Sequence, residues 1–260
     1  MTTTKIESEG EDYIFYPNKL NEILNYNDYG DGDSLKQIHP SSMGYCKRQM
    51  LSNKLGIKEL SLDIKAKMAK GTAFHEFLQS KKFYRDDKVE MSMFEAVNKQ
   101  FLDEDEGVFV KGRCDAIDTE GNIYDYKITG GLSYLNGSPR PKDVDQLQVY
   151  LELFDKEKGY LVYVSRSLNY VKGSVSKSQP IEVVQFEVER DRERFNTLRD
   201  KALDVYRELS SMVESVKGVD IDLNDFGEED ISFEKCGCFF CRSEGELDFE
   251  KSDYLREVIQ

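Results

Sequence analysis

The sequence of 260 residues has no apolar run that approaches the length of a membrane span. It also lacks the apolar core of a secretion signal, because its first residues, MTTTKIESEGEDYIF, are polar and acidic. These two absences predict a protein that is neither membrane-embedded nor exported, and we expect a cytoplasmic location. Hydrophobic residues make up 39% and charged residues 33% of the chain, which is typical of a globular protein with a buried core.

Positive charge is scarce: 36 Lys and Arg residues oppose 50 Asp and Glu residues, which gives a net charge of −14. On this balance alone, nucleic acid is a poor candidate for a partner. The charge is uneven, because residues 43–70 carry a local balance of +5 and leave −19 for the rest of the chain. This basic segment could follow a phosphate backbone, or it could form the solvated faces of two helices.

Only five cysteines are present, and three of them form the tight pattern Cys236-x-Cys238-x-x-Cys241. Without an export signal, disulfides are not expected, and this spacing indicates metal thiolates instead. A tetrahedral zinc site or an iron–sulfur cluster needs a fourth ligand, for which Cys46 and Cys114 are the candidates. Cys114 directly precedes Asp115 in a predicted strand, so we expect it to face the core as a small apolar residue.

The hydrophobic periodicity changes along the chain from helical to strand-like and back again. Residues 1–37 are expected to form a partly helical lead-in with a loop. We expect helices at about 42–54, 62–84, 144–154 and 190–216. We expect strands at about 89–97, 107–117, 123–129, 159–166 and 181–189, with a polar loop at 167–180. This order predicts an α/β fold with a mixed central sheet flanked by helices.

The predicted strand IYDYKIT (123–129) contains Asp125-Tyr126-Lys127. Alternate residues of a strand share a face, so the Asp125 carboxylate and the Lys127 ammonium project to the same side. A turn centred near Glu120 would place Asp115 opposite Asp125. Two carboxylates can bind magnesium or manganese, which can activate water against a phosphate. The alternative is a cluster of charges on a solvated sheet face.

Three other polar residues could belong to the same patch. His75, one of only two histidines, is expected on a helix among apolar residues. Gln146 and Tyr150 are four residues apart and therefore share a helix face. They could hydrogen-bond to a substrate or order the lysine. The alternatives are a core histidine and an ordinary amphipathic helix.

Four motifs in order, GTAFH (71–75), GRCDAI (112–117), DYKITG (125–130) and QLQVY (146–150), resemble the RecB-type nucleases of the PD-(D/E)xK superfamily. The resemblance covers residues 71–150 and implies a restriction-endonuclease-like core. It implies metal ligation by His75, Asp115, Asp125 and the Tyr126 carbonyl. It also implies that Lys127 is the catalytic lysine and that Gln146 and Tyr150 complete the site.

The segment PSSMGYCKR (40–48), followed by the later cysteine trio, resembles one branch of these nucleases that carries an iron–sulfur cluster. That branch includes stand-alone CRISPR-associated exonucleases and AddB-type nuclease subunits. The resemblance implies a 4Fe-4S cluster held by Cys46, Cys236, Cys238 and Cys241. The gaps of one and two residues within the trio depart from the pattern of the branch and leave zinc as an alternative.

These observations predict four segments: an acidic lead-in (1–40), a helical segment (41–88), a nuclease core (89–217) and a C-terminal cysteine segment (218–260). They predict a metal-dependent DNA exonuclease that acts on single-stranded DNA or DNA ends, with a protein partner that supplies part of the affinity. One alternative is a non-catalytic DNA-binding or assembly subunit with the same fold. Another is a zinc-stabilised endonuclease of the same superfamily.

Overall fold

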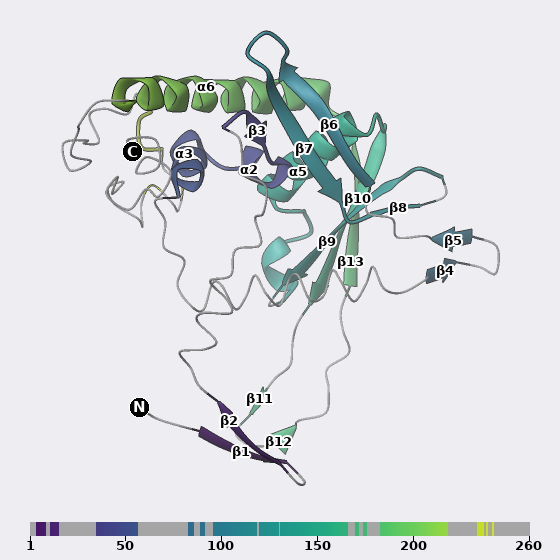
Figure 1. Cartoon of the computed structure of the whole chain (residues 1–260). Coiled ribbons are helices and arrows are strands. Elements are labelled where there is room, and N and C mark those ends of the chain that lie inside the picture. The colour runs from purple at the N-terminus through teal and green to yellow at the C-terminus, as the bar shows by residue number, and fades with distance from the viewer. Residues whose placement is uncertain are drawn as a thin grey trace.

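The computed structural model describes most of the predicted core and parts of both flanking regions (Figure 1). The described residues are 4–8, 11–15, 35–56, 83–85, 89–91, 96–118, 120–129, 131–165, 170–171, 174–175, 183–217, 233–236, 238 and 241. His75 and residues 62–82 of the predicted second helix lie outside them.

Runs of consecutive strands separate the described helices along the chain. The helices are α2 (Pro40–Met43), α3 (Lys47–Leu55), α5 (Pro141–Leu153) and α6 (Arg192–Val216), with a 3-10 turn at Ser133–Leu135. The strands are β1 (Thr4–Ser8), β2 (Glu11–Phe15), β3 (Gln37–Ile38), β4 (Phe83–Arg85), β5 (Val89–Met91), β6 (Ala96–Asp103), β7 (Val108–Cys114), β8 (Ala116–Ile117), β9 (Ile123–Thr129), β10 (Lys158–Ser165), β11 (Tyr170–Val171), β12 (Ser174–Val175) and β13 (Val183–Glu189).

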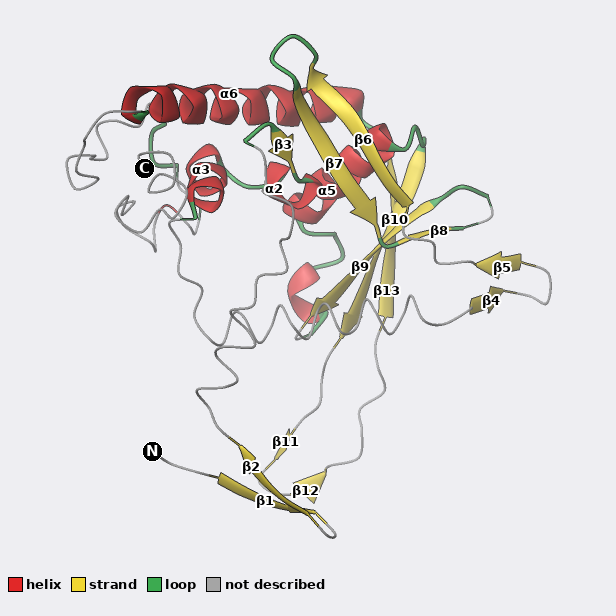
Figure 2. Cartoon of the chain, in the orientation of Figure 1, coloured by secondary structure: helices red, strands yellow, loops and turns green. Residues whose placement is uncertain are grey.

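Two sheets carry the core. One has the strand order β13-β10-β9-β8, in which β9 and β10 are parallel and the outer pairs are antiparallel. The other has the order β3-β7-β6. Parallel strands need a crossover connection, and α5 provides it between β9 and β10. Helix α6 runs past α3, α2 and α5 on one side of the sheets (Figure 2). The predicted α/β fold, with mixed sheets flanked by helices, is confirmed.

Amphipathic spacing explains how the helices pack. On α6, Leu198, Ala202, Val205 and Leu209 recur at intervals of three and four residues and are all buried, as expected for one face of a helix. The Asp191 carboxylate caps this helix by accepting a hydrogen bond from the Arg194 backbone N–H at 2.9 Å. Among the described residues, no helix is both long enough and apolar enough to cross a membrane.

Several predicted boundaries were wrong. The predicted lead-in at residues 1–37 contains the paired strands β1 and β2, and residues 83–84, predicted as the end of a helix, belong to β4. The predicted strand at 89–97 is two strands, of which β6 continues to Asp103 because it pairs with β7. The loop at 167–180 contains the short strands β11 and β12. Each of these strands pairs with the next or the preceding strand in the chain, and strand formation depends on such pairing and on burial more than on the local residue pattern.

The predicted helix at 42–54 is also divided, into α2 and α3. Cys46 is the N-cap of α3 and has an extended backbone (φ −71°, ψ 160°). Gly44, just before it, packs against α5 so closely that a Cβ would lie 2.8 Å from the Lys142 carbonyl oxygen. The break lets the chain turn between α2 and α3, and it leaves Cys46 at the start of α3.

The backbone at Gly112 on β7 also lies close to other elements, which explains why the GRCDAI motif has a glycine at this position. A Cβ on this residue would lie 2.5 Å from Pro40 Cγ and 3.0 Å from Tyr150 Cε1. The missing side chain therefore lets β7 contact both α2 and α5.

We expect Gly112→Ala to lower the free energy of unfolding by about 1–3 kcal/mol, because the new methyl group overpacks this contact. Urea unfolding followed by circular dichroism measures the change. Gly131→Ala is the matched control, because a Cβ there meets no atom within 4 Å. Equal stability of the two variants would contradict the packing role of Gly112.

Candidate active site and cysteine cluster

Asp115 lies where the chain passes from one sheet to the other, between β7 and β8. The pairs Ala116–Tyr124 and Ile117–Ile123 join β8 to β9, so the predicted turn register is confirmed. Among the described residues, no strand continues this pairing beyond Tyr124. The Asp115 side chain bonds to β9 where a partner strand would otherwise pair with it: its Oδ2 accepts a hydrogen bond from the Tyr126 backbone N–H at 2.8 Å.

Asp125 is a buried carboxylate, with 1% of its surface exposed. Its Oδ2 lies 2.7 Å from Lys127 Nζ but makes no well-oriented hydrogen bond within the described residues. Burial raises the pKa of Asp125 to about 6, against the lowering effect of Lys127, and the neighbouring Asp115 charge adds to the rise. The protein environment alone therefore disfavours this charge, and an added cation would favour it.

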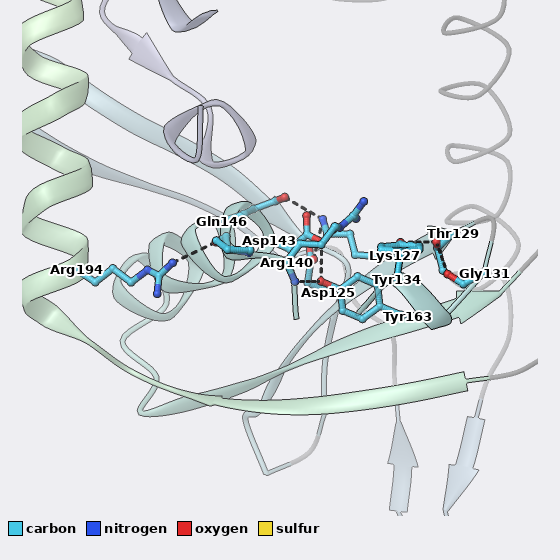
Figure 3. A network of polar contacts seen from close by, with 11 residues as sticks. Asp125, Lys127, Thr129, Gly131, Tyr134, Arg140, Asp143, Gln146, Tyr163 and Arg194 are labelled. Atoms are coloured by element: carbon cyan, nitrogen blue, oxygen red, sulfur yellow. Dashed lines mark hydrogen bonds and ion pairs between the residues drawn. The ribbon is translucent and has the colours of Figure 1, made fainter. Parts of the chain in front are cut away.

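Lys127 connects the carboxylates to α5. Its Nζ donates to Gln146 Oε1 at 2.9 Å (Figure 3). Gln146 Nε2 donates in turn to the hydroxyl oxygen of the buried Tyr150 at 3.2 Å. Burial by itself would lower the pKa of Lys127, but the charges of Asp125, Asp143 and Asp115 outweigh it and raise the pKa. The side chain is thus held as an ammonium ion.

A third carboxylate, Asp143, was missed by the sequence analysis. It is buried in the first turn of α5, where its Oδ2 accepts hydrogen bonds from the Tyr163 hydroxyl at 2.6 Å and from Arg140 Nε at 2.5 Å. Figure 3 shows this group beside Asp125 and Lys127. The available signal was an acidic residue just after Pro141, where the helix dipole favours negative charge.

The structure therefore brings together five of the predicted site residues, from the β7–β8 junction, β9 and α5. They are Asp115, Asp125, Lys127, Gln146 and Tyr150. Tyr126 lies between Asp125 and Lys127 and adds its backbone to the group. His75 is outside the described residues. The contacts are observed, whereas the catalytic and ligand roles stay predictions.

The donor set on this patch fits a hard divalent cation. Asp115 and Asp125 provide carboxylate oxygens, which magnesium and manganese prefer. The strongest sign is the raised pKa of the buried Asp125, because it shows that Lys127 alone does not fully compensate the buried carboxylate charge.

The cysteine trio meets Cys46, as predicted. The Sγ atoms of Cys46, Cys236, Cys238 and Cys241 all lie within 4.8 Å of one another. Cys114 is fully buried in the hydrophobic core and is not part of the group. A hydrogen bond from the Cys241 backbone is the main cause that lowers the pKa of Cys238 to about 7, while burial raises the pKa of Cys46 to about 12.

No family model and no curated protein matches the chain. The solved structure of SSO0001 is similar at 22% identity over 72% of this chain and 82% of that chain, with a TM-score of 0.47. An alkaline exonuclease from Laribacter hongkongensis is similar at 11% identity over 70% of this chain and 92% of its own, with a TM-score of 0.45. A phage-related exonuclease from Haemophilus somnus 129PT has 13% identity over 77% of this chain and 83% of its own, with a TM-score of 0.37. These similarities assign neither a family nor a function.

The raised pKa of Asp125 makes the stability of the metal-free protein depend on pH. The folded-state pKa of about 6 lies above the ordinary value of 3.8, so the contribution of this carboxyl group is fully present below about pH 4 and is lost as the pH rises through about 6. We expect the stability of Asp125→Asn relative to wild type to rise by on the order of 3 kcal/mol between about pH 4 and pH 7.

Urea unfolding in the presence of a chelator, at a series of pH values, measures this difference. Asp105→Asn, which removes an exposed carboxylate from the turn between β6 and β7, provides the control. A difference between Asp125→Asn and wild type that stays constant with pH would show that the Asp125 carboxylate is not disfavoured in the fold.

Proposed function

We propose that the protein is a metal-dependent nuclease that hydrolyses DNA phosphodiester bonds, and that it acts as an exonuclease on single-stranded DNA or DNA ends. One observation carries the proposal. The buried Asp125–Lys127 pair is joined to Gln146 and Tyr150 on α5 and lies beside Asp115. An ordinary ion pair on a strand would not require this convergence of chemically matched groups.

Asp115, Asp125 and the Tyr126 carbonyl would hold magnesium or manganese, together with His75 by the resemblance. When bound, such an ion supplies Lewis-acid stabilisation of phosphate charge and lowers the pKa of a bound water. The Tyr126 N–H points toward Asp115, and the C=O of a strand residue points to the same edge as its N–H. The backbone of Tyr126 is therefore oriented toward the same side of β9 as Asp115.

Lys127 would stabilise the negative charge that develops on the phosphate, because its raised pKa keeps it an ammonium ion. Asp125 and Gln146 fix the position of Nζ from two directions. Tyr150 in turn accepts a hydrogen bond from Gln146 and so orients its amide. A preorganised charge of this kind needs little rearrangement when the substrate reacts.

A cationic group beside the carboxylates supports a phosphate-bearing substrate. Partial burial and the positive charges of Arg140 and Lys127 lower the pKa of Lys142, so the three cations lie within electrostatic reach of one another. Lys47 and Arg48, at the start of α3, instead contact Asp204 and the Phe233 carbonyl. Because Lys127 belongs to the carboxylate site and Arg140 and Lys142 lie near it, we place the phosphate contacts at the start of α5.

A non-catalytic DNA-binding subunit is the competing function. It would not need Asp125 to be buried beside Lys127, since burial disfavours the Asp125 carboxylate more than Lys127 favours it. The iron–sulfur cluster implied by the resemblance is not needed for the proposed chemistry.

Lys127→Met and Asp125→Asn are each expected to lower DNA cleavage by about 100- to 1,000-fold, the loss typical of a group that stabilises transition-state charge. Cleavage of end-labelled linear single-stranded DNA with manganese measures the effect. Lys158→Met is the matched lysine control, since Lys158 is exposed on the neighbouring strand β10. Wild-type rates in both site variants would refute the assignment. Cleavage of circular single strands would refute the exonuclease form of the proposal.

Two glutamines on α5 separate a catalytic effect from a structural one. Gln146→Leu is expected to slow cleavage by about 10- to 100-fold, as for residues that orient a site group, with little change in stability. Gln148 instead donates to the Glu189 carbonyl and accepts from the Asp191 N–H. Gln148→Leu is therefore expected to lower stability by about 1–3 kcal/mol while the folded fraction keeps its rate.

Melting temperature and single-turnover rate, measured on both glutamine variants, test this division. Slower cleavage by folded Gln148→Leu and a wild-type rate for Gln146→Leu would contradict the proposed position of Gln146 beside Lys127.

A further inference from the structure

The four clustered cysteines have sulfur positions that identify the kind of metal site. Cys46 Sγ lies 3.9 Å from Cys241 Sγ and 3.6 Å from Cys238 Sγ, and Cys236 Sγ lies 3.7 Å from Cys241 Sγ. A zinc ion at the centre of a sulfur tetrahedron, with zinc–sulfur bonds of about 2.3 Å, sets neighbouring sulfurs about 3.8 Å apart. These three of the six sulfur–sulfur separations match this value, and all six are no longer than 4.8 Å.

A four-iron cluster requires a wider arrangement. Each of its four thiolates binds a different iron atom, so the iron and sulfide atoms of the cluster stand between the cysteine sulfurs. Here all four Sγ atoms lie within 4.8 Å of one another, which leaves room for one ion between them. The donor set therefore does not fit the cluster that the resemblance implies.

Within the part of the chain that the structure describes, the pocket beside the cysteines does not provide an alternative position for a cluster. A pocket of about 420 Å³ adjoins the group, but only Cys46 and Cys236 of the four line it. Its remaining walls come from Lys47, Arg48, Lys201, Phe233 and Glu234. A cluster in this pocket would contact Cys46 and Cys236 but not Cys238 and Cys241.

The sequence spacing agrees with a single ion. Cys236, Cys238 and Cys241 fall within six consecutive residues, so a short turn of backbone can present three thiolates to one centre. Soft thiolate ligands in a tetrahedral set select zinc or iron, and a closed set of four without an open position is typical of structural zinc.

We infer that Cys46, Cys236, Cys238 and Cys241 bind one tetrahedral zinc ion rather than a four-iron cluster, independently of the proposed nuclease activity. The ion joins the N-cap of α3 to a segment 195 positions later in the chain. Two further contacts hold the same segment: Arg48 donates to the Phe233 carbonyl at 3.1 Å, and Lys47 Nζ lies 5.0 Å from the Phe233 ring centroid. Zinc binding thus stabilises the docking of the C-terminal segment on α3.

Metal and sulfide analysis of the full chain tests this inference. The protein is purified without oxygen from cells supplied with both iron and zinc, and its metal content, acid-labile sulfide and visible absorption are measured. We expect about one zinc atom per chain, no sulfide and no visible band. About four iron atoms with four sulfides, a metal-free disulfide, or a chain with no bound metal would each overturn the inference.

X-ray absorption at the zinc edge gives a second measurement on the wild-type protein, so the test does not depend on a variant that folds. We expect one shell of four sulfurs at about 2.3 Å, and nitrogen or oxygen ligands in place of a sulfur would overturn the assignment. Cys46→Ser is expected to lose most of the bound zinc. Cys114→Ala is the matched control, because Cys114 lies in the core outside the group, and it should keep the full zinc content.

Discussion

The central constraint on this structure is the burial of Asp125 beside Lys127. A carboxylate with 1% exposure is disfavoured unless positive charge and hydrogen bonds surround it. Lys127 supplies the charge, and Gln146 holds Lys127 in place. Because α5 crosses between the parallel strands β9 and β10, the same connection that builds the sheet also brings Gln146 to the ammonium.

The division of the strands into two sheets places Asp115 beside the backbone of Tyr126 on β9. Strand β7 ends at Cys114 and strand β8 begins at Ala116, so Asp115 is the single residue between the two strands. Its carboxylate bonds to the Tyr126 backbone, where a strand partner would otherwise stand. Gly112 allows β7 to approach α2 and α5 just before this point. The packing contact at Gly112 and the carboxylate of Asp115 therefore lie within four consecutive residues of the GRCDAI motif.

The cysteine group is a second centre with a different purpose. It draws on the start of α3 and on a short segment after α6, and its ligands are soft sulfurs rather than hard oxygens. The two proposed sites would therefore select different metals within one chain. The oxygen site suits an ion that exchanges with solvent and substrate, whereas a closed set of thiolates suits an ion that stabilises the fold.

The sequence by itself determined the parts of the protein that depend on near neighbours. Alternation within IYDYKIT placed Asp125 and Lys127 on one face, the turn near Glu120 placed Asp115 across from them, and helical spacing paired Gln146 with Tyr150. Only the tertiary structure revealed Asp143, the break at Cys46 and the separation of the sulfur atoms. These depend on α5 packing against β9, on Gly44 meeting α5, and on the C-terminal segment docking on α3. Contacts between residues far apart in the chain are set by the packing of whole elements, and no local pattern of residues records them.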